Sequence, residues 1–144
     1  MFLDFSSFIF IQPDWSLLIL RIVIGAIFIA HGTQKLSMWN MQASPQMHGT
    51  MLMIMKVLSI VEPVAGVAVL TGMFTQTAAF FLGVIMVGAI FFKIRMMKTP
   101  FMALDKTGWE FDLLIFAAAI VLISFGGGAL SLDRMFAPSV LPLL

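Results

Sequence analysis

An apolar stretch near the N-terminus carries three side chains that could do chemistry inside a membrane, Arg21, His31 and Lys35. At about 100° per residue on a helix, these three fall within a sector of roughly 80°. A charged side chain in hydrocarbon costs roughly 2.5–3.5 kcal/mol on insertion scales, so we expect this sector to face other helices rather than lipid. Arginine, lysine and histidine donate hydrogen bonds, and histidine titrates near neutrality, so the sector is suited to holding a polar ligand or passing a proton.

An acidic side chain lies in the middle of the next apolar stretch. Glu62 precedes Pro63, whose ring cannot donate a hydrogen bond to the preceding turn of a helix. Gly66, one turn later, would let another helix approach closely. At about 1.5 Å of rise per residue, Glu62 lies near the membrane midplane and Arg21 lies about 9 Å from it. We therefore predict that Arg21 reaches down to pair with Glu62.

A second polar cluster is expected nearer one membrane surface. By the same estimate, Lys35 and Glu110 lie about 12 Å from the midplane on one side, with His31 at about 6 Å. Glu110 and Asp112 lie about 200° apart on a helix, so only one of them can face the helix bundle. We favour Glu110, because an apolar face continues from it along the helix, and we expect Asp112 to pair with a loop lysine or with lipid headgroups.

Composition places the chain in a bilayer. Its 144 residues are 61% hydrophobic and 10% charged, with a mean hydropathy of +1.08, whereas soluble domains have about 25% charged residues. Four apolar segments have membrane-spanning length, and they are 17–36, 51–73, 76–94 and 109–126. An interfacial segment, 1–16, precedes them and a tail, 127–144, follows. We predict one all-α integral membrane domain, 1–144, built as a four-helix transmembrane bundle with short loops.

Several classes of chemistry are disfavoured by the residues present. The chain has no cysteine, which excludes disulfide exchange and thiolate metal sites within it. Met47, His48, Met51 and Met55 are residue types that can bind Cu(I). However, methionine is more often an adaptable apolar filler, and the chain has 13 of them. We therefore predict no metal site and no intrinsic cofactor. The net charge of +1 gives no reason to expect nucleic acid as a partner.

Lysine and arginine are distributed unevenly along the predicted topology. Of the eight basic residues, six lie in or beside the two loops on one side, and they are Lys35, Lys56, Lys93, Arg95, Lys98 and Lys106. The positive-inside rule puts that side in the cytoplasm, so both termini are predicted to lie outside it.

Three segments, in the right order, resemble the DoxX family. LLILRIVIGAIFIAHGTQKL is similar to the first-helix signature of the family, with its Arg, its HG and its QKL. VEPVAGVAVLTGMFTQTAA resembles the second-helix stretch, and GWEFDLLIFAAAIVLISFGGGALSLD resembles the end of the fourth helix with its closing SLD. The resemblance implies a four-helix protein of the bacterial inner membrane. Some relatives are associated with quinone-linked oxidoreductases, including the membrane subunit of a thiosulfate:quinone oxidoreductase, and others with oxidative-stress complexes.

The function expected from these observations is that of a non-catalytic or quinone-interacting subunit of an oxidoreductase complex. His31, Lys35 and Glu110 would hold the quinone, because its carbonyl oxygens need hydrogen-bond donors near the polar–apolar boundary. A soluble or membrane redox partner protein would supply the electrons. Two alternatives stay open. One is a membrane scaffold without chemistry, and the other is a small solute transporter or channel that uses Arg21 and Glu62 and acts as a homo-oligomer.

Overall fold

The computed structural model describes residues 13–44, 48–102 and 107–136. Within these ranges the chain forms helices and loops without a β-strand, so the all-α prediction is confirmed. The helices in chain order are α2 (Pro13–Lys35), the short 3₁₀ helix η1 (Leu36–Asn40), α3 (Gly49–Thr71), α4 (Thr75–Arg95), α5 (Trp109–Phe125) and the short α6 (Leu132–Phe136).

The start of α2 and the end of α3 differ from the predicted ones, and a single residue explains each difference. α2 begins at Pro13 rather than at Leu17, because proline suits a first helical turn, where its missing N–H has no partner to lose. Residues 13–16 of the predicted interfacial segment are therefore helical, and residues 1–12 lie outside the described ranges. α3 ends at Thr71 and is capped by Gly72, whose φ of 74° is a left-handed conformation that glycine adopts without strain. The predicted tail contains α6, and residues 137–144 lie outside the described ranges.

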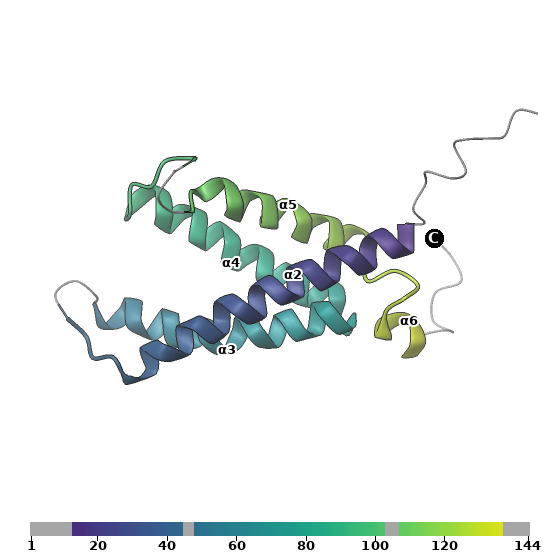
Figure 1. The fold of residues 1–144 in the computed structure, drawn as a ribbon, viewed down its shortest axis with the longest axis horizontal. Coiled ribbons are helices and arrows are strands. Elements are labelled where there is room, and N and C mark those ends of the chain that lie inside the picture. The colour runs from purple at the N-terminus through teal and green to yellow at the C-terminus, as the bar shows by residue number, and fades with distance from the viewer. Residues whose placement is uncertain (1–12, 45–47, 103–106, 137–144) are drawn as a thin grey trace, which may run out of the picture.

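The four long helices pack as two antiparallel hairpins, α2 with α3 and α4 with α5 (Figure 1). The α2/α3 contact is close because glycines remove side chains from it. A Cβ built on Gly25 would lie 2.7 Å from the carbonyl oxygen of Gly66, and one on Gly32 would lie 2.2 Å from Cδ of Pro63. The buried side of α2 includes Arg21, Gly25, Phe28 and Gly32, whereas His31, at the edge of the predicted sector, is exposed.

The two ends of the molecule have different architectures. The first, which we call the loop end, carries the connections 36–48 and 96–108, and the hairpins diverge towards it (Figure 1). The second, which we call the terminal end, carries the start of α2, the tight α3–α4 turn and α6 (Figure 1). A core of apolar side chains lies between the hairpins, and it includes Ile24, Phe28, Val69, Leu82, Ile115 and Leu122.

Among the described residues, three helical segments are long and apolar enough to cross a membrane: Pro13–Asn40, Gly49–Thr71 and Thr75–Arg95. α5 is shorter, with 17 residues. Many large apolar side chains on the outer faces of the helices are exposed, which is typical of a surface covered by lipid rather than by water.

Candidate functional site

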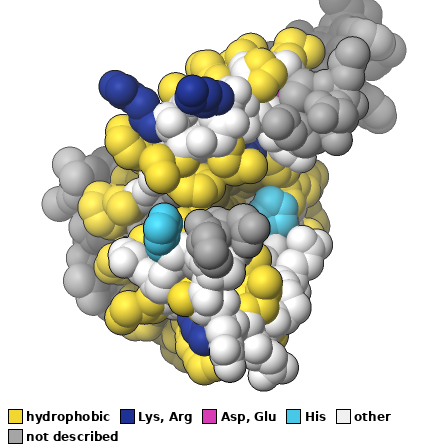
Figure 2. Space-filling model, turned by 90° about the vertical axis from the view of Figure 1, so that its left-hand side faces the viewer, with side chains coloured by type: hydrophobic (Ala, Val, Ile, Leu, Met, Phe, Trp, Pro, Cys, Tyr) yellow, Lys and Arg dark blue, Asp and Glu magenta, His cyan; other side chains and the backbone are white. Residues whose placement is uncertain are grey.

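A cleft of about 490 Å³ lies between the hairpins and extends from the loop end. All four long helices line it, mostly with methionine, phenylalanine and aliphatic side chains. Its polar lining consists of His31, Lys35, Glu62, Lys93 and Asp112. Figure 2 looks onto the loop end and shows cationic and histidine side chains at the surface among apolar ones. The volume falls within the roughly 300–1,000 Å³ typical of small-molecule sites.

The first ion pair in the cleft joins Lys35 to Glu62. Lys35 is the last residue of α2, where a cation also complements the helix dipole. Its ammonium group donates to both carboxylate oxygens of Glu62. The Glu62 side chain is 2% exposed and the Lys35 side chain 22% exposed. A carboxylate this buried needs such a counter-ion, because desolvating an unpaired charge is costly.

The second ion pair joins Lys93 to Asp112. Nζ of Lys93 lies 2.7 Å from Oδ2 of Asp112 and donates a hydrogen bond to the carbonyl oxygen of Gly108 at 3.1 Å. Lys93 belongs to the last turn of α4 and Asp112 to the first turn of α5. Each hairpin thus places a lysine near the end of its first helix and a carboxylate on its second helix.

His31 lies at the rim of the cleft, on the exposed side of α2. Its ring centroid lies 6.2 Å from that of Phe111 on α5, with the ring planes tilted by 42°. The imidazole therefore bridges the two hairpins at the edge of the cleft, next to the Lys35–Glu62 pair on one side and α5 on the other.

The prediction that Glu110 faces the helix bundle is wrong. Asp112 is the buried acid of α5 and lines the cleft, whereas Glu110 is half-buried and does not line it. Its backbone N–H donates to the carbonyl oxygen of Phe101 at 3.2 Å, and its side chain lies beside Gly108 in the preceding loop. The face that continues from Glu110 is exposed, and it contains Leu114, Ala117 and Val121. The buried face contains Asp112, Ile115, Ala119 and Leu122.

The predicted Arg21–Glu62 pair is also wrong. Arg21 is fully buried at the terminal end, where Nη2 donates to the carbonyl oxygen of Leu130 at 2.5 Å. Its Nε and Nη1 atoms are buried without a hydrogen-bond partner among the described residues. The acid that interacts with it electrostatically is Asp133, while Glu62 pairs with Lys35.

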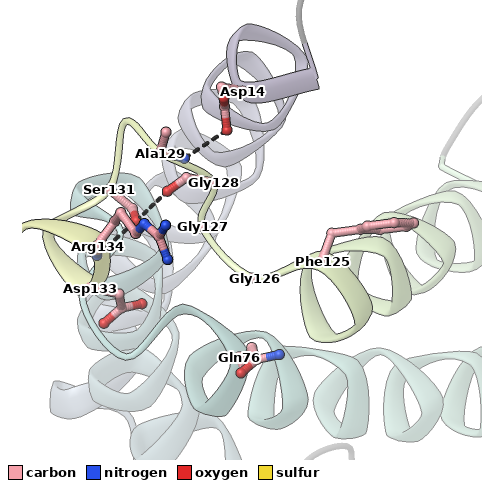
Figure 3. Close-up of a pocket in the computed structure, with 10 residues that line it drawn as sticks. All are labelled: Asp14, Gln76, Phe125, Gly126, Gly127, Gly128, Ala129, Ser131, Asp133 and Arg134. Carbon is pink, nitrogen blue, oxygen red and sulfur yellow. Dashed lines mark hydrogen bonds between the residues drawn. The ribbon is translucent and has the colours of Figure 1, made fainter. Parts of the chain in front are cut away.

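The SLD sequence at residues 131–133 forms a polar network at the terminal end (Figure 3). The Asp133 carboxylate accepts hydrogen bonds from the backbone N–H of Phe74 at 2.7 Å, the backbone N–H of Thr75 at 2.8 Å and the hydroxyl of Thr75 at 2.8 Å. It therefore caps the N-terminus of α4 from 58 residues away in sequence. No local feature of the sequence indicates this capping role for the SLD motif.

A second cavity, of about 570 Å³, lies beside this network, and Asp14 and Gln76 are among its lining residues (Figure 3). Both side chains already serve as structural ties. Oδ1 of Asp14 accepts the backbone N–H of Ala129 at 2.7 Å, and Nε2 of Gln76 donates to the carbonyl oxygen of Ile123 at 2.8 Å. The polar contacts at the terminal end therefore hold the helices together. The cleft at the loop end is the candidate functional site.

Comparison with known proteins identifies the family of the chain. The model of the DoxX family matches residues 16–94, which include Lys35, Glu62 and Lys93 of the cleft. An uncharacterized protein of Haemophilus influenzae is 31% identical over 117 residues, covering 81% of this chain and 87% of the relative. The Bacillus subtilis protein named "Putative oxidoreductase CatD" is 30% identical over 119 residues, covering 81% of this chain and 83% of the relative. No solved structure matches. These matches show that the chain, with its three helical segments long and apolar enough to cross a membrane, belongs to the DoxX family.

Proposed function

We propose that the chain is a quinone-binding membrane subunit of an oxidoreductase complex and that the quinone binds in the cleft. The observation that carries the proposal is a mostly apolar cleft with one lysine–carboxylate pair from each hairpin, Lys35–Glu62 and Lys93–Asp112. A quinone is a flat apolar ring with two carbonyl oxygens, so it needs apolar walls and hydrogen-bond donors at separate places. The cleft offers both.

The polar residues of the cleft suit the proton chemistry of such a ligand. Reduction of a quinone to a quinol takes up two electrons and two protons. Each ammonium group can donate a hydrogen bond to a carbonyl oxygen, and its paired carboxylate can accept and return a proton. His31 adds an imidazole at the rim, which can donate or accept a hydrogen bond. The electrons would come from a partner protein. The name of the Bacillus subtilis relative, which calls it a "Putative oxidoreductase", supports a redox role for this chain.

We also infer that α5 crosses the membrane as a fourth span. Its 17 residues rise about 25 Å, close to the ~30 Å of the hydrocarbon core, and it packs along α4. The cations at the loop end favour placing that end in the bacterial cytoplasm, with both termini outside the inner membrane. A redox partner in the cytoplasm would then meet the open end of the cleft.

Quinone binding to the purified protein in detergent tests the proposal. The probes are short-chain ubiquinone and menadione, and the readout is quenching of tryptophan fluorescence. Two paired variants, Lys35→Met with Glu62→Gln and Lys93→Met with Asp112→Asn, remove donors without leaving an unpaired buried charge. Each is expected to weaken binding by tenfold or more, because a hydrogen bond to a charged group contributes about 1.5–3 kcal/mol. The matched control is Lys56→Met, since Lys56 does not line the cleft.

The same assay separates the site in the structure from the one expected from sequence. Glu110→Gln should leave quinone binding unchanged. It would weaken binding if Glu110 held the quinone, as the sequence predicted. Absence of saturable quinone binding in the wild type, or equal binding by all variants, would reject the proposal. Co-purification with bulk lipid alone would then favour a scaffold, and a solute flux in liposomes that Glu62→Gln abolishes would favour a transporter.

A further inference from the structure

The two sides of the cleft differ in polarity. Among the described residues, those that α2 and α5 contribute to the lining are all polar, and they are His31, Lys35 and Asp112. α3 and α4 contribute the apolar lining, together with Glu62 and Lys93. A ligand that fills the cleft therefore needs a polar part that faces α2 and α5 and an apolar part that lies between α3 and α4.

The apolar side of the cleft reaches the outer surface of the molecule between α3 and α4. Ile54 of α3 is 47% exposed and Phe91 of α4 is 63% exposed, and both line the cleft. Both lie about 6–8 Å from the loop end of their helices, so they stand at the same level. We call the part of the cleft between them the side opening. In a bilayer, the side opening would face lipid hydrocarbon.

Gly88 leaves free space in the side opening. It lies three residues before Phe91 on α4, lines the cleft and is exposed. A Cβ built on Gly88 would meet no atom within 4 Å, whereas one on Gly25, Gly32 or Gly66 would collide with a neighbouring helix. Close packing of helices therefore explains the other three glycines but not Gly88.

The opposite side of the cleft is bridged by an aromatic contact. The ring centroid of His31 on α2 lies 6.2 Å from that of Phe111 on α5. A flexible chain that left the cleft between α2 and α5 would have to pass this contact and the polar wall. The side opening between α3 and α4 offers an apolar path without such a contact among the lining residues that the structure describes.

We propose that the side opening takes the isoprenoid tail of a membrane quinone, which rests on the quinone-binding function proposed above. The quinone ring lies against the polar wall, and the tail runs past Gly88 into the lipid. The polar ring and the apolar tail match the two sides of the cleft, so the substrate class is a tailed quinone that enters from the bilayer. Gly88 is then a specificity-determining residue, because a side chain there would occupy the path of the tail.

Quinone binding to the full-length protein in detergent, followed by quenching of tryptophan fluorescence, tests the proposal. The two probes share one ring and are ubiquinone without a tail and ubiquinone with a tail of two isoprene units. Gly88→Leu should weaken binding of the tailed quinone at least tenfold more than binding of the tail-less one, because it fills the side opening. Comparison of variant and wild type with the same quinone cancels the partition of that quinone into the micelle.

Val87→Phe is the matched control. Val87 is the preceding residue of α4, is 51% exposed and does not line the cleft, so the added bulk should leave the ratio of the two affinities unchanged. Gly88→Leu is expected to fold, because leucine favours a helix more than glycine does and its Cβ enters free space. Thermal unfolding of both variants verifies this.

The tail-less quinone separates the two proposals. A wild type that does not bind it would reject the quinone site, and the tail path with it. Where it binds, equal weakening of both quinones by Gly88→Leu would make Gly88 part of the ring site. Weakening of neither quinone would leave the side opening to lipid acyl chains. Either result, or the same change of ratio in Val87→Phe, would overturn the tail path while the quinone site stands.

Discussion

The Lys35–Glu62 pair permits a sharp test, because its two members are buried to different degrees. Lys35→Met removes the counter-ion of a carboxylate that is 2% exposed. Glu62→Gln removes the counter-ion of an ammonium group that is 22% exposed and ends a helix. The two single changes break the same contact, but they leave different groups behind, so they should not cost the same free energy.

The expected loss of unfolding free energy depends on which charged group stays buried after each substitution. Removing one partner of a buried ion pair costs about 3–5 kcal/mol, and we expect Lys35→Met to fall in this range, since the Glu62 side chain is almost fully buried. Glu62→Gln should cost only about 1–2 kcal/mol, because the amide still accepts a hydrogen bond and the long lysine side chain can turn towards the interface. The double variant should lose less than the sum, with a coupling energy of at least about 1 kcal/mol.

The assay is equilibrium unfolding in mixed micelles, followed by circular dichroism, for the wild type, both single variants and the double variant. A second cycle with Arg21→Lys and Glu62→Gln is the control. Arg21 lies against Gly72, about 15 Å along α3 from Glu62, so these two changes should be additive within about 0.5 kcal/mol. Equal losses from the two single changes at Lys35 and Glu62, or additivity in the first cycle, would refute the reasoning.

Two further predictions concern the contacts that hold the fold together, both measured by the same unfolding assay. Gly32→Ala would place a Cβ 2.2 Å from Cδ of Pro63, a rigid ring that cannot turn aside, so the free energy of unfolding should fall by about 1–3 kcal/mol. Gly88→Ala is its control, since a Cβ there meets nothing within 4 Å, and a loss as large as that of Gly32→Ala would contradict the explanation. Asp133→Asn should cost about 1–2 kcal/mol, because the carboxylate caps the N-terminus of α4 through three hydrogen bonds. The exposed Arg134→Gln should be nearly neutral, and an equal loss in both variants would argue against the cap.

The sequence predicted the buried side of α2 for Arg21 and Lys35, because polar residues are rare in that helix, but His31, at the edge of the same sector, is exposed. It could not give the partners of that sector. The depth estimate put Glu62 near the midplane and Arg21 about 9 Å from it, but α2 is shifted along α3, since Gly32 rather than the middle of α2 lies beside Pro63. The shift is fixed by the fit of Gly32 against Pro63, a contact between helices that local sequence does not encode. Lys35 therefore reaches Glu62, and Arg21 does not.

The inward face of α5 was misjudged for a different reason. That helix is apolar on all sides, so the apolar residues that follow Glu110 and those that follow Asp112 are equivalent as sequence patterns. Only the position of Lys93 on the neighbouring helix favours Asp112. The role of Asp133 was equally hidden, since a cap donated from 58 residues away leaves no local signal at the helix that it caps. In each case the missing information was an interaction between distant segments.

The two ion pairs lie at different distances from the loop end, where the cleft opens. Asp112 is in the first turn of α5, about 4–5 Å from the start of that helix, whereas Glu62 lies about 20 Å from the start of α3. One pair is thus close to the loop end, and the other is near the middle of its helix. A proton that enters from the aqueous side at the loop end would meet Lys93–Asp112 before Lys35–Glu62. For a quinone bound between the hairpins, this order assigns the first proton exchange with water to Asp112 and leaves Glu62 to act inside the bundle.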